Sequence, residues 1–188
     1  IQAAQGKFSG IVNGIDIDYW SPEKDTYIPK HYSISTIAHK AHNKLALLEH
    51  VGLDTDLEAP LIGSISRLVE NKGFPLIIDL LDEFVELGAR FIFLGSGQED
   101  IATQLHEAVK RHPGRIAFDD GYNEPLAHLI EAGSDMFLMP SRFEPCGLNQ
   151  LYSLRYGTIP IVNNTGGLRD TVHNWENGSG TGFVFQPY

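Results

Sequence analysis

Two basic residues stand five positions apart in a segment that follows a short apolar run and ends on a glycine. Arg67 offers a planar guanidinium fork and Lys72 a compact ammonium, and together they suit the paired phosphates of a diphosphate. Gly73 then allows the next helix to begin in a tight turn. Taken alone, this turn is equally compatible with a solvated basic loop, so its meaning depends on the other turns of the chain.

Two further turns each bring a pair of glycines in front of an expected helix. Gly95 and Gly97 form a Gly-x-Gly that lacks the third glycine of the full dinucleotide-binding motif, and Gly166 and Gly167 follow Thr165. Glycines let a ligand approach the backbone closely, and the N-terminus of the next helix adds partial positive charge. A pair this short is also typical of an ordinary tight connection between a strand and a helix.

A fourth turn carries a carboxylate and the single thiol of the chain, Glu144 and Cys146, just before a helix that is expected to begin near Gly147. The backbone amides of Gly147, Leu148 and Asn149 can then face an anion. Glu144 can accept hydrogen bonds from hydroxyl groups, and capping of the helix N-terminus is the alternative interpretation. Four such turns at one edge of a sheet favour a ligand site more than any one of them does.

The elements that must position these turns alternate along the chain. Short apolar runs rich in β-branched residues are separated by stretches of helical period, such as Leu76–Val85, which predicts an α/β fold. Strands joined by such helices must be mostly parallel, so we expect a doubly wound, Rossmann-like sheet with ligands beyond the carboxyl ends of its strands. Upstream, an apolar stripe from Ile34 to Leu48 predicts one more helix that stops near Gly52. The expected strands are Leu61–Ile65, Arg90–Leu94, Arg115–Phe118, Met136–Met139, Ile159–Val162 and Gly182–Phe185.

The composition is that of an ordinary globular chain, with 42% hydrophobic and 20% charged residues among 188. Lys and Arg number 14 against 24 Asp and Glu, a formal net charge of -10 that argues against binding to nucleic acids or anionic membranes. One cysteine excludes a disulfide framework within this chain. No apolar run approaches the length of a membrane span. A bound anion must therefore be captured by local groups.

The segment Glu144–Tyr152 resembles the signature segment of bacterial glycogen synthases and plant starch synthases, which are retaining glycosyltransferases of family five with the GT-B fold. The agreement covers essentially the whole chain in the expected order. Tyr152 stands where the wider retaining GT-B superfamily has its second glutamate, and Asn149 replaces the threonine of many bacterial members. Further agreement lies at Gly10–Asp16, Arg67, Lys72-Gly73, Thr165–Leu168 and Gly182-Phe183.

The resemblance implies an enzyme that transfers glucose from ADP-glucose, sometimes UDP-glucose, to the non-reducing end of an α-1,4-glucan, with no cofactor. It implies that residues 1–20 are an interdomain linker and that residues 21–188 are the donor-nucleotide domain, the C-terminal half of a GT-B fold truncated at its own C-terminus. The family's N-terminal half, which mainly holds the glucan acceptor, is absent from these residues. We therefore expect this piece to bind ADP or ADP-glucose weakly and to transfer no glucose. The expected location is the cytoplasm of a bacterium or the plastid of a plant.

The resemblance also assigns roles to individual residues. Arg67 and Lys72 become ligands of the donor diphosphate that neutralise the charge of the departing ADP. Glu144 holds glucose hydroxyls, and the ring of Tyr122 packs against the adenine. The other residues placed at the nucleotide, phosphates or sugar are Gly95, Gly97, Cys146, Gly147, Leu148, Asn149, Thr165, Gly166 and Gly167.

Two pairs of residues have spacings that occur in metal sites, but we predict no metal requirement. His39 and His42 stand three positions apart without an acidic partner nearby, which favours a surface location. Asp119 and Asp120 form an acidic pair, but the family that the chain resembles holds its diphosphate with cations and helix ends.

Two alternatives to a glucan synthase domain stay open at this point. One is a nucleotide-sensing or assembly module that keeps the pocket without catalysis. The other is the donor domain of a different GT-B transferase, such as a sucrose or trehalose type. The residues that precede this segment in its parent polypeptide would separate the first alternative, and the preferred nucleotide base would separate the second.

Overall fold

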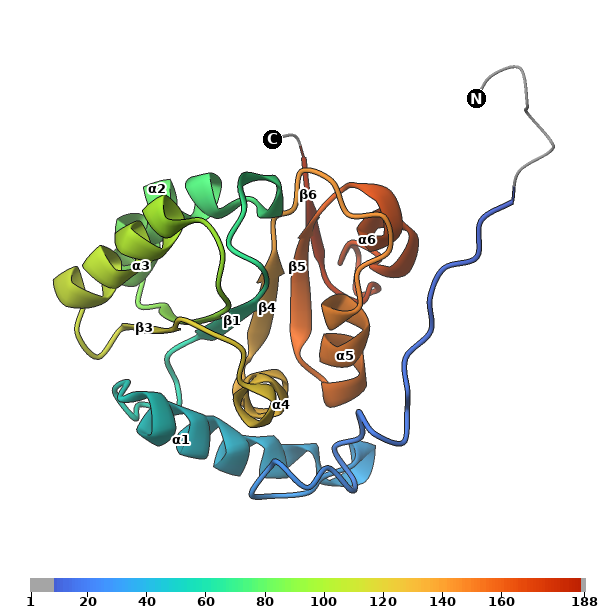
Figure 1. The fold of residues 1–188 in the computed structure, drawn as a ribbon. Helices are drawn as coiled ribbons and strands as arrows, with labels where there is room; N and C mark the ends of the chain where they lie inside the picture. Colours follow the sequence, from blue (N-terminus) through green and yellow to red (C-terminus); the bar gives the residue numbers. More distant parts are fainter. Residues whose placement is uncertain (1–8, 187–188) are drawn as a thin grey trace, which may run out of the picture.

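The computed structural model describes residues 9–186, which contain a six-stranded parallel sheet (Figure 1). The strands are β1 (Leu61–Ile65), β2 (Arg90–Leu94), β3 (Ile116–Asp119), β4 (Met136–Met139), β5 (Ile159–Asn163) and β6 (Phe183–Phe185). Their order is β3-β2-β1-β4-β5-β6, and every neighbouring pair is parallel. The chain winds outward from β1 to β3, crosses back to β4 beside β1, and winds outward again to β6. The expected doubly wound sheet is confirmed, and no strand boundary differs from the prediction by more than one residue.

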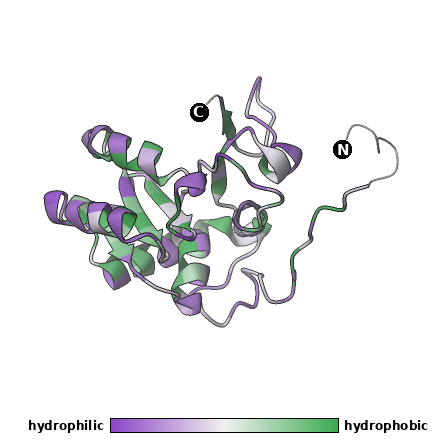
Figure 2. Ribbon diagram, turned by 45° about the horizontal axis from the view of Figure 1, so that its top comes forward, coloured by the Kyte–Doolittle hydropathy of each residue, from purple (hydrophilic) through white to green (hydrophobic). Residues whose placement is uncertain are grey.

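Helices cover both faces of the sheet, and because side chains alternate along each strand, successive strand residues enter two different cores. The helices are α1 (Lys40–Val51), α2 (Phe74–Glu86), α3 (Glu99–Arg111), α4 (Glu124–Gly133), α5 (Asn149–Tyr156) and α6 (Gly166–Thr171), with 3₁₀ turns η2 (Ile34–His39) and η3 (Glu70–Lys72). In β2, Ile92 and Leu94 face a core shared with α1 and α4, while Phe91 and Phe93 face a core shared with α2 and α3. In Figure 2 the strands are mostly green, whereas the helices alternate between green and purple, as expected for elements with one buried face.

The first long helix differs from the prediction. The apolar stripe that begins at Ile34 predicts one continuous helix, but Ile34 lies in η2 and is 97% exposed. The buried face of α1 includes Asn43 and Lys44. The Asn43 side chain accepts from the backbone N–H of Lys30 and donates to its carbonyl, and the Lys44 ammonium contacts Asp135 at 2.6 Å. Paired polar groups occupy the buried face, so the apolar period does not mark it.

The segment before η2 is fastened to the domain by a group of side chains that we call the anchor cluster: Trp20, Asp25, His128, Tyr152 and Tyr156. The indole of Trp20 stacks between the rings of His128 and Tyr152, with centroids 3.8 Å away on each side. Beneath it, the Asp25 carboxylate contacts His128 Nδ1 at 2.8 Å and accepts a hydrogen bond from the Tyr156 hydroxyl at 2.5 Å. The cluster therefore joins the N-terminal segment to α4 and α5.

Candidate functional site

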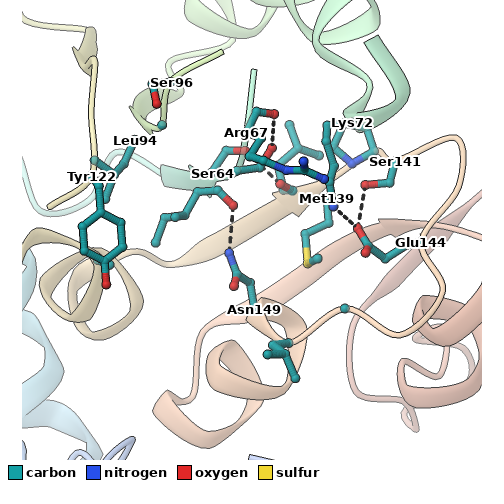
Figure 3. Close-up of a pocket in the computed structure, with 18 of the residues that line it drawn as sticks. Ser64, Arg67, Lys72, Leu94, Ser96, Tyr122, Met139, Ser141, Glu144 and Asn149 are labelled. Carbon is teal, nitrogen blue, oxygen red and sulfur yellow. Dashed lines mark hydrogen bonds and ion pairs between the residues drawn. The ribbon is translucent and has the colours of Figure 1, made fainter. Parts of the chain in front are cut away.

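The site lies where the strand order reverses, between the neighbouring strands β1 and β4. The turn after β1 leads toward α2 on one face, and the turn after β4 leads to α5 on the other, so the two turns separate at this point. Between them lies a cavity of about 360 Å³, which we call the strand-end cavity (Figure 3). The turn after β2 and the turn that leads into α4 complete its walls.

The two predicted cations reach this cavity from the same turn. Lys72 is the last residue of η3, and its ammonium contacts Glu144 Oε2 at 2.5 Å. Both side chains are largely buried, with 19% of Lys72 and 10% of Glu144 exposed. Arg67 is exposed and forms no ion pair within the described part of the chain. One cation is therefore held by a carboxylate, and the other faces the cavity without one.

The carboxylate of Glu144 is held at one oxygen. Besides Lys72, the buried hydroxyl of Ser141 donates to the same Oε2 atom at 3.1 Å. No side chain or backbone group in residues 9–186 contacts the other oxygen, Oε1, within hydrogen-bond distance. Figure 3 shows this carboxylate at one end of the cavity, beside Lys72 and Ser141. The arrangement leaves Oε1 able to accept hydrogen bonds from a ligand.

The N-terminus of α5 forms part of the cavity wall. Gly147 has a φ of 73°, in the left-handed region, and this turns the chain into the helix. The amides of Gly147 and Leu148 donate to no acceptor among the described residues, as expected at the start of a helix. The side chain of Asn149 is partly engaged, because one N–H of Nδ2 donates to the carbonyl of Ile65 at 2.8 Å. The helix end can thus attract an anion, while Asn149 ties it to β1.

The two glycine pairs bring neighbouring turns into backbone contact. A methyl group at Gly95 would overlap the carbonyl oxygen of Ser66, and one at Gly97 would overlap that of Leu68. Hydrogen bonds continue the pairing of β1 and β2 into these turns, with Leu68 N–H donating to the Ser96 carbonyl at 2.9 Å. The glycines therefore hold the turn that carries Arg67 against the turn after β2.

The second pair acts in the same way on the turn that carries Glu144. Methyl groups at Gly166 and Gly167 would overlap the carbonyl oxygens of Glu144 and Cys146, respectively. The N–H of Gly167 donates to the Glu144 carbonyl at 3.0 Å. This pair supports the backbone of the carboxylate.

Most of the residues predicted from the sequence come together at the strand-end cavity. They belong to different turns, and the parallel topology explains why they meet. Tyr122 is 87% exposed and lies at the end of the cavity opposite Glu144 (Figure 3). Their roles toward a ligand stay predictions. The predicted residues that line the cavity are Arg67, Lys72, Gly95, Tyr122, Glu144, Gly147, Leu148 and Asn149.

The other predicted residues do not line the cavity, and several residues that do line it were not predicted. Tyr152, at the position of the superfamily's second glutamate, stacks on Trp20 in the anchor cluster and does not line the cavity. The lining serines and Asn123 were assigned no role from the sequence, although Ser141 lies in the same turn as Glu144. The predicted residues outside the lining are Gly97, Cys146, Thr165, Gly166 and Gly167, and the polar ones that were missed are Ser64, Ser66, Ser96, Asn123 and Ser141.

Comparison with known protein families gives a match to the model described as "Glycosyl transferases group 1" over residues 48–188. The chain belongs to this family. Among the curated group 1 relatives, a glycogen synthase of Marinomonas sp. (strain MWYL1) is 48% identical over 187 residues. Glycogen synthase 1 of Methylococcus capsulatus (strain ATCC 33009 / NCIMB 11132 / Bath) is 47% identical over 192 residues. These alignments cover 99% and 100% of this chain but only 39% of each relative.

Among solved structures, the catalytic domain of starch synthase IV from Arabidopsis thaliana, bound to ADP and acarbose, matches with a TM-score of 0.91 and 37% identity. It is matched over 99% of this chain and 40% of its own. Anabaena HepE in complex with UDP and glucose matches with a TM-score of 0.65 at 22% identity, a likeness of fold alone. These matches agree with a Rossmann-like domain from the C-terminal half of a GT-B glycosyltransferase.

Two features are absent from residues 9–186. No helix there is long and apolar enough to cross a membrane. No group of three or more His, Cys, Asp or Glu side chains in that range is arranged to hold a metal ion.

Proposed function

We propose that this chain is the donor-nucleotide domain of a glycogen or starch synthase and that its ligand is ADP-glucose. The observation that carries the proposal is the meeting of Arg67, Lys72 and Glu144 in one cavity at the switch point of the sheet. The relatives that match over nearly the whole chain are named glycogen synthases, which favours this proposal over a sensing module or a sucrose-type transferase.

In the proposed reaction, the bond between the glucose anomeric carbon and the diphosphate breaks, and the same carbon forms a bond to a hydroxyl oxygen of the glucan, which loses its proton. Negative charge accumulates on the departing ADP. Arg67 and Lys72 compensate this charge with cationic groups that already line the cavity when no ligand is bound. The free amides of Gly147 and Leu148 add to the positive potential. Glu144 Oε1 accepts hydrogen bonds from the glucose hydroxyls, and the ring of Tyr122 covers the adenine.

The whole polypeptide is proposed to carry out transfer, because this chain spans about 39% of the relatives it matches. An additional domain would hold most of the α-1,4-glucan acceptor. The 188-residue chain is then expected to bind the donor without turnover. Release of ADP from ADP-glucose in the presence of glycogen, at a rate above the background, would contradict this division of roles.

The direct test is a calorimetric titration of the chain with ADP, UDP and GDP. Calorimetry is preferable to intrinsic fluorescence here, because neither Trp20 nor Trp175 lines the strand-end cavity. ADP is expected to bind most tightly, and adenosine much more weakly than ADP. Tighter binding of UDP or GDP would refute ADP-glucose as the donor, and no binding of any diphosphate would refute the proposed function.

A further inference from the structure

A chain of hydrogen bonds leads from β5 to the carboxylate of Glu144. The Nδ2 atom of Asn163, the last residue of β5, donates to the backbone carbonyl of Ser141 at 2.9 Å. The hydroxyl of Ser141 donates in turn to Glu144 Oε2 at 3.1 Å. Counted as whole residues, Asn163, Ser141 and Glu144 are 7%, 2% and 7% exposed. Buried hydrogen bonds of this kind fix the orientation of the groups they join.

The same carboxylate oxygen also receives Lys72, but the two contacts differ in what a diphosphate does to them. A bound diphosphate offers Lys72 further negatively charged acceptors, so the ion pair with Glu144 is then shared or lost. The Ser141 hydroxyl donates to no other acceptor within residues 9–186. The contact from Ser141 is therefore the one that persists when Lys72 turns to the ligand.

The backbone of Glu144 is held separately, because its carbonyl accepts from the N–H of Gly167 at 3.0 Å. What remains to be fixed is the side chain, which has several rotatable bonds and would otherwise sample several rotamers. With Oε2 bound by Ser141, Oε1 is the atom left for a ligand. A supporting contact of this kind is what a precise binding site requires.

We propose that Ser141 is a positioning residue that orients Glu144 toward the donor sugar, and that Asn163 acts through Ser141. The inference rests on the proposed function, because it assigns Glu144 to the sugar and not to the nucleotide. It requires that removal of the Ser141 hydroxyl weakens the binding of ADP-glucose and leaves the binding of ADP nearly unchanged. A merely structural role of Ser141 would weaken the binding of both ligands together.

The test compares ADP and ADP-glucose by calorimetry with the 188-residue chain. S141A is expected to raise the Kd for ADP-glucose about 5- to 20-fold and to change the Kd for ADP less than about 2-fold. S134A is the matched control, because Ser134 is buried at the C-terminal end of α4, outside the cavity, and its hydroxyl has no partner. S134A is expected to leave both values unchanged. S141T, which keeps the hydroxyl, is expected to restore most of the affinity for ADP-glucose.

The relay from Asn163 is tested by a double-mutant cycle. N163A is expected to weaken ADP-glucose binding less than S141A does, and the double variant is expected to lose no more than S141A alone. Additive losses would overturn the role of Asn163. Equal losses for ADP and ADP-glucose in S141A, or no loss for either, would overturn the role of Ser141. If the unmodified chain binds neither ligand, the proposed function fails and this inference fails with it.

Discussion

The strand-end cavity and the anchor cluster use similar side chains in opposite ways. In the cavity, Arg67 has no carboxylate partner within the described residues, and Glu144 Oε1 accepts no hydrogen bond from them. In the anchor cluster, the Asp25 carboxylate is 1% exposed and receives the Tyr27 N–H as well as His128 and Tyr156. The Asp25 carboxylate is therefore bonded within the fold, whereas Arg67 and Glu144 Oε1 in the cavity can still bond to a ligand.

This difference teaches how to separate a site from a structural polar cluster when both contain charged residues. A buried charge that is fully paired is expensive to disturb, so its removal shows in the free energy of unfolding. An exposed charge that forms no ion pair with the described residues, such as that of Arg67, contributes little to folding, so its removal shows in binding.

The largest effect is expected for Asp25→Ala. This change leaves His128 and the Tyr156 hydroxyl without their common acceptor, and it should lower the free energy of unfolding by about 3–5 kcal/mol. Urea unfolding followed by circular dichroism measures the loss. Asp18→Ala is the matched control, because Asp18 pairs with Lys24 on the exposed surface and should change stability far less than Asp25→Ala does. A similar loss in both variants would remove the distinction between the buried and the exposed acid.

Lys72→Ala comes next and acts on binding. Loss of one charge-assisted contact should weaken ADP binding by about 1.5–3 kcal/mol and leave adenosine nearly unaffected. Arg67→Ala should behave in the same way. Lys110→Ala, on the exposed surface of α3, controls for the loss of one positive charge. If Lys110→Ala weakens ADP binding as much as Lys72→Ala, the cavity has no specific role in diphosphate capture.

Acid should act on the anchor cluster through Asp25, with a smaller effect than deletion of the side chain. Burial alone would raise the pKa of Asp25, but hydrogen bonds from His128 and Tyr156 outweigh it and hold the pKa below its usual value. The unfolded chain therefore takes up this proton at a higher pH than the folded chain, and stability is lost as pH falls from about 4 through the folded pKa. Urea unfolding between pH 5 and 3 should show a weaker pH dependence in Asp25→Ala than in the unmodified chain. Parallel curves would contradict the assignment.

The smallest effect is expected for Glu131→Gln, in the buried region behind the anchor cluster. Glu131 is fully buried, and burial raises its pKa to about 8, so the carboxyl is mostly protonated near pH 6. Glutamine has the same shape and can still accept from the Ser153 hydroxyl, so stability near pH 4.5 should change by less than about 1 kcal/mol, and at pH 6 the variant should not be the less stable of the two. Because the folded pKa lies above the ordinary value of 4.5, the unmodified chain should lose stability as pH rises from about 4.5 to about 8, and the variant should lose less. A large loss at pH 6 would show that the charged form is needed.

Much of the fold could be predicted, because each strand is a short apolar run and the helices between the strands require parallel pairing. The same topology predicts that Arg67, Lys72 and Glu144 meet, since the turns that carry them follow neighbouring parallel strands. The buried face of α1 could not be predicted from hydrophobic period, because Lys44 is buried only through contacts such as the one with Asp135, far away in the sequence.

The supporting residues of the site could not be predicted for a related reason. Ser141 and Asn163 are polar residues without a motif of their own. They form a hydrogen bond only because the ends of the neighbouring strands β4 and β5 lie close together. Trp20 likewise gives no sign in the sequence that His128, 108 positions later, lies against its ring. Local patterns reveal the elements and the charged turns, whereas contacts between distant polar side chains depend on the finished packing.

The backbone contacts at the glycine pairs have a consequence for tolerance to mutation. A side chain at Gly95, Gly97, Gly166 or Gly167 would press on a peptide carbonyl, which has no rotamer by which to move aside. A saturation library selected for nucleotide binding should therefore retain glycine at all four positions, although three of them never touch the cavity. The turns at the strand ends therefore constrain one another through their backbones and cannot change shape independently.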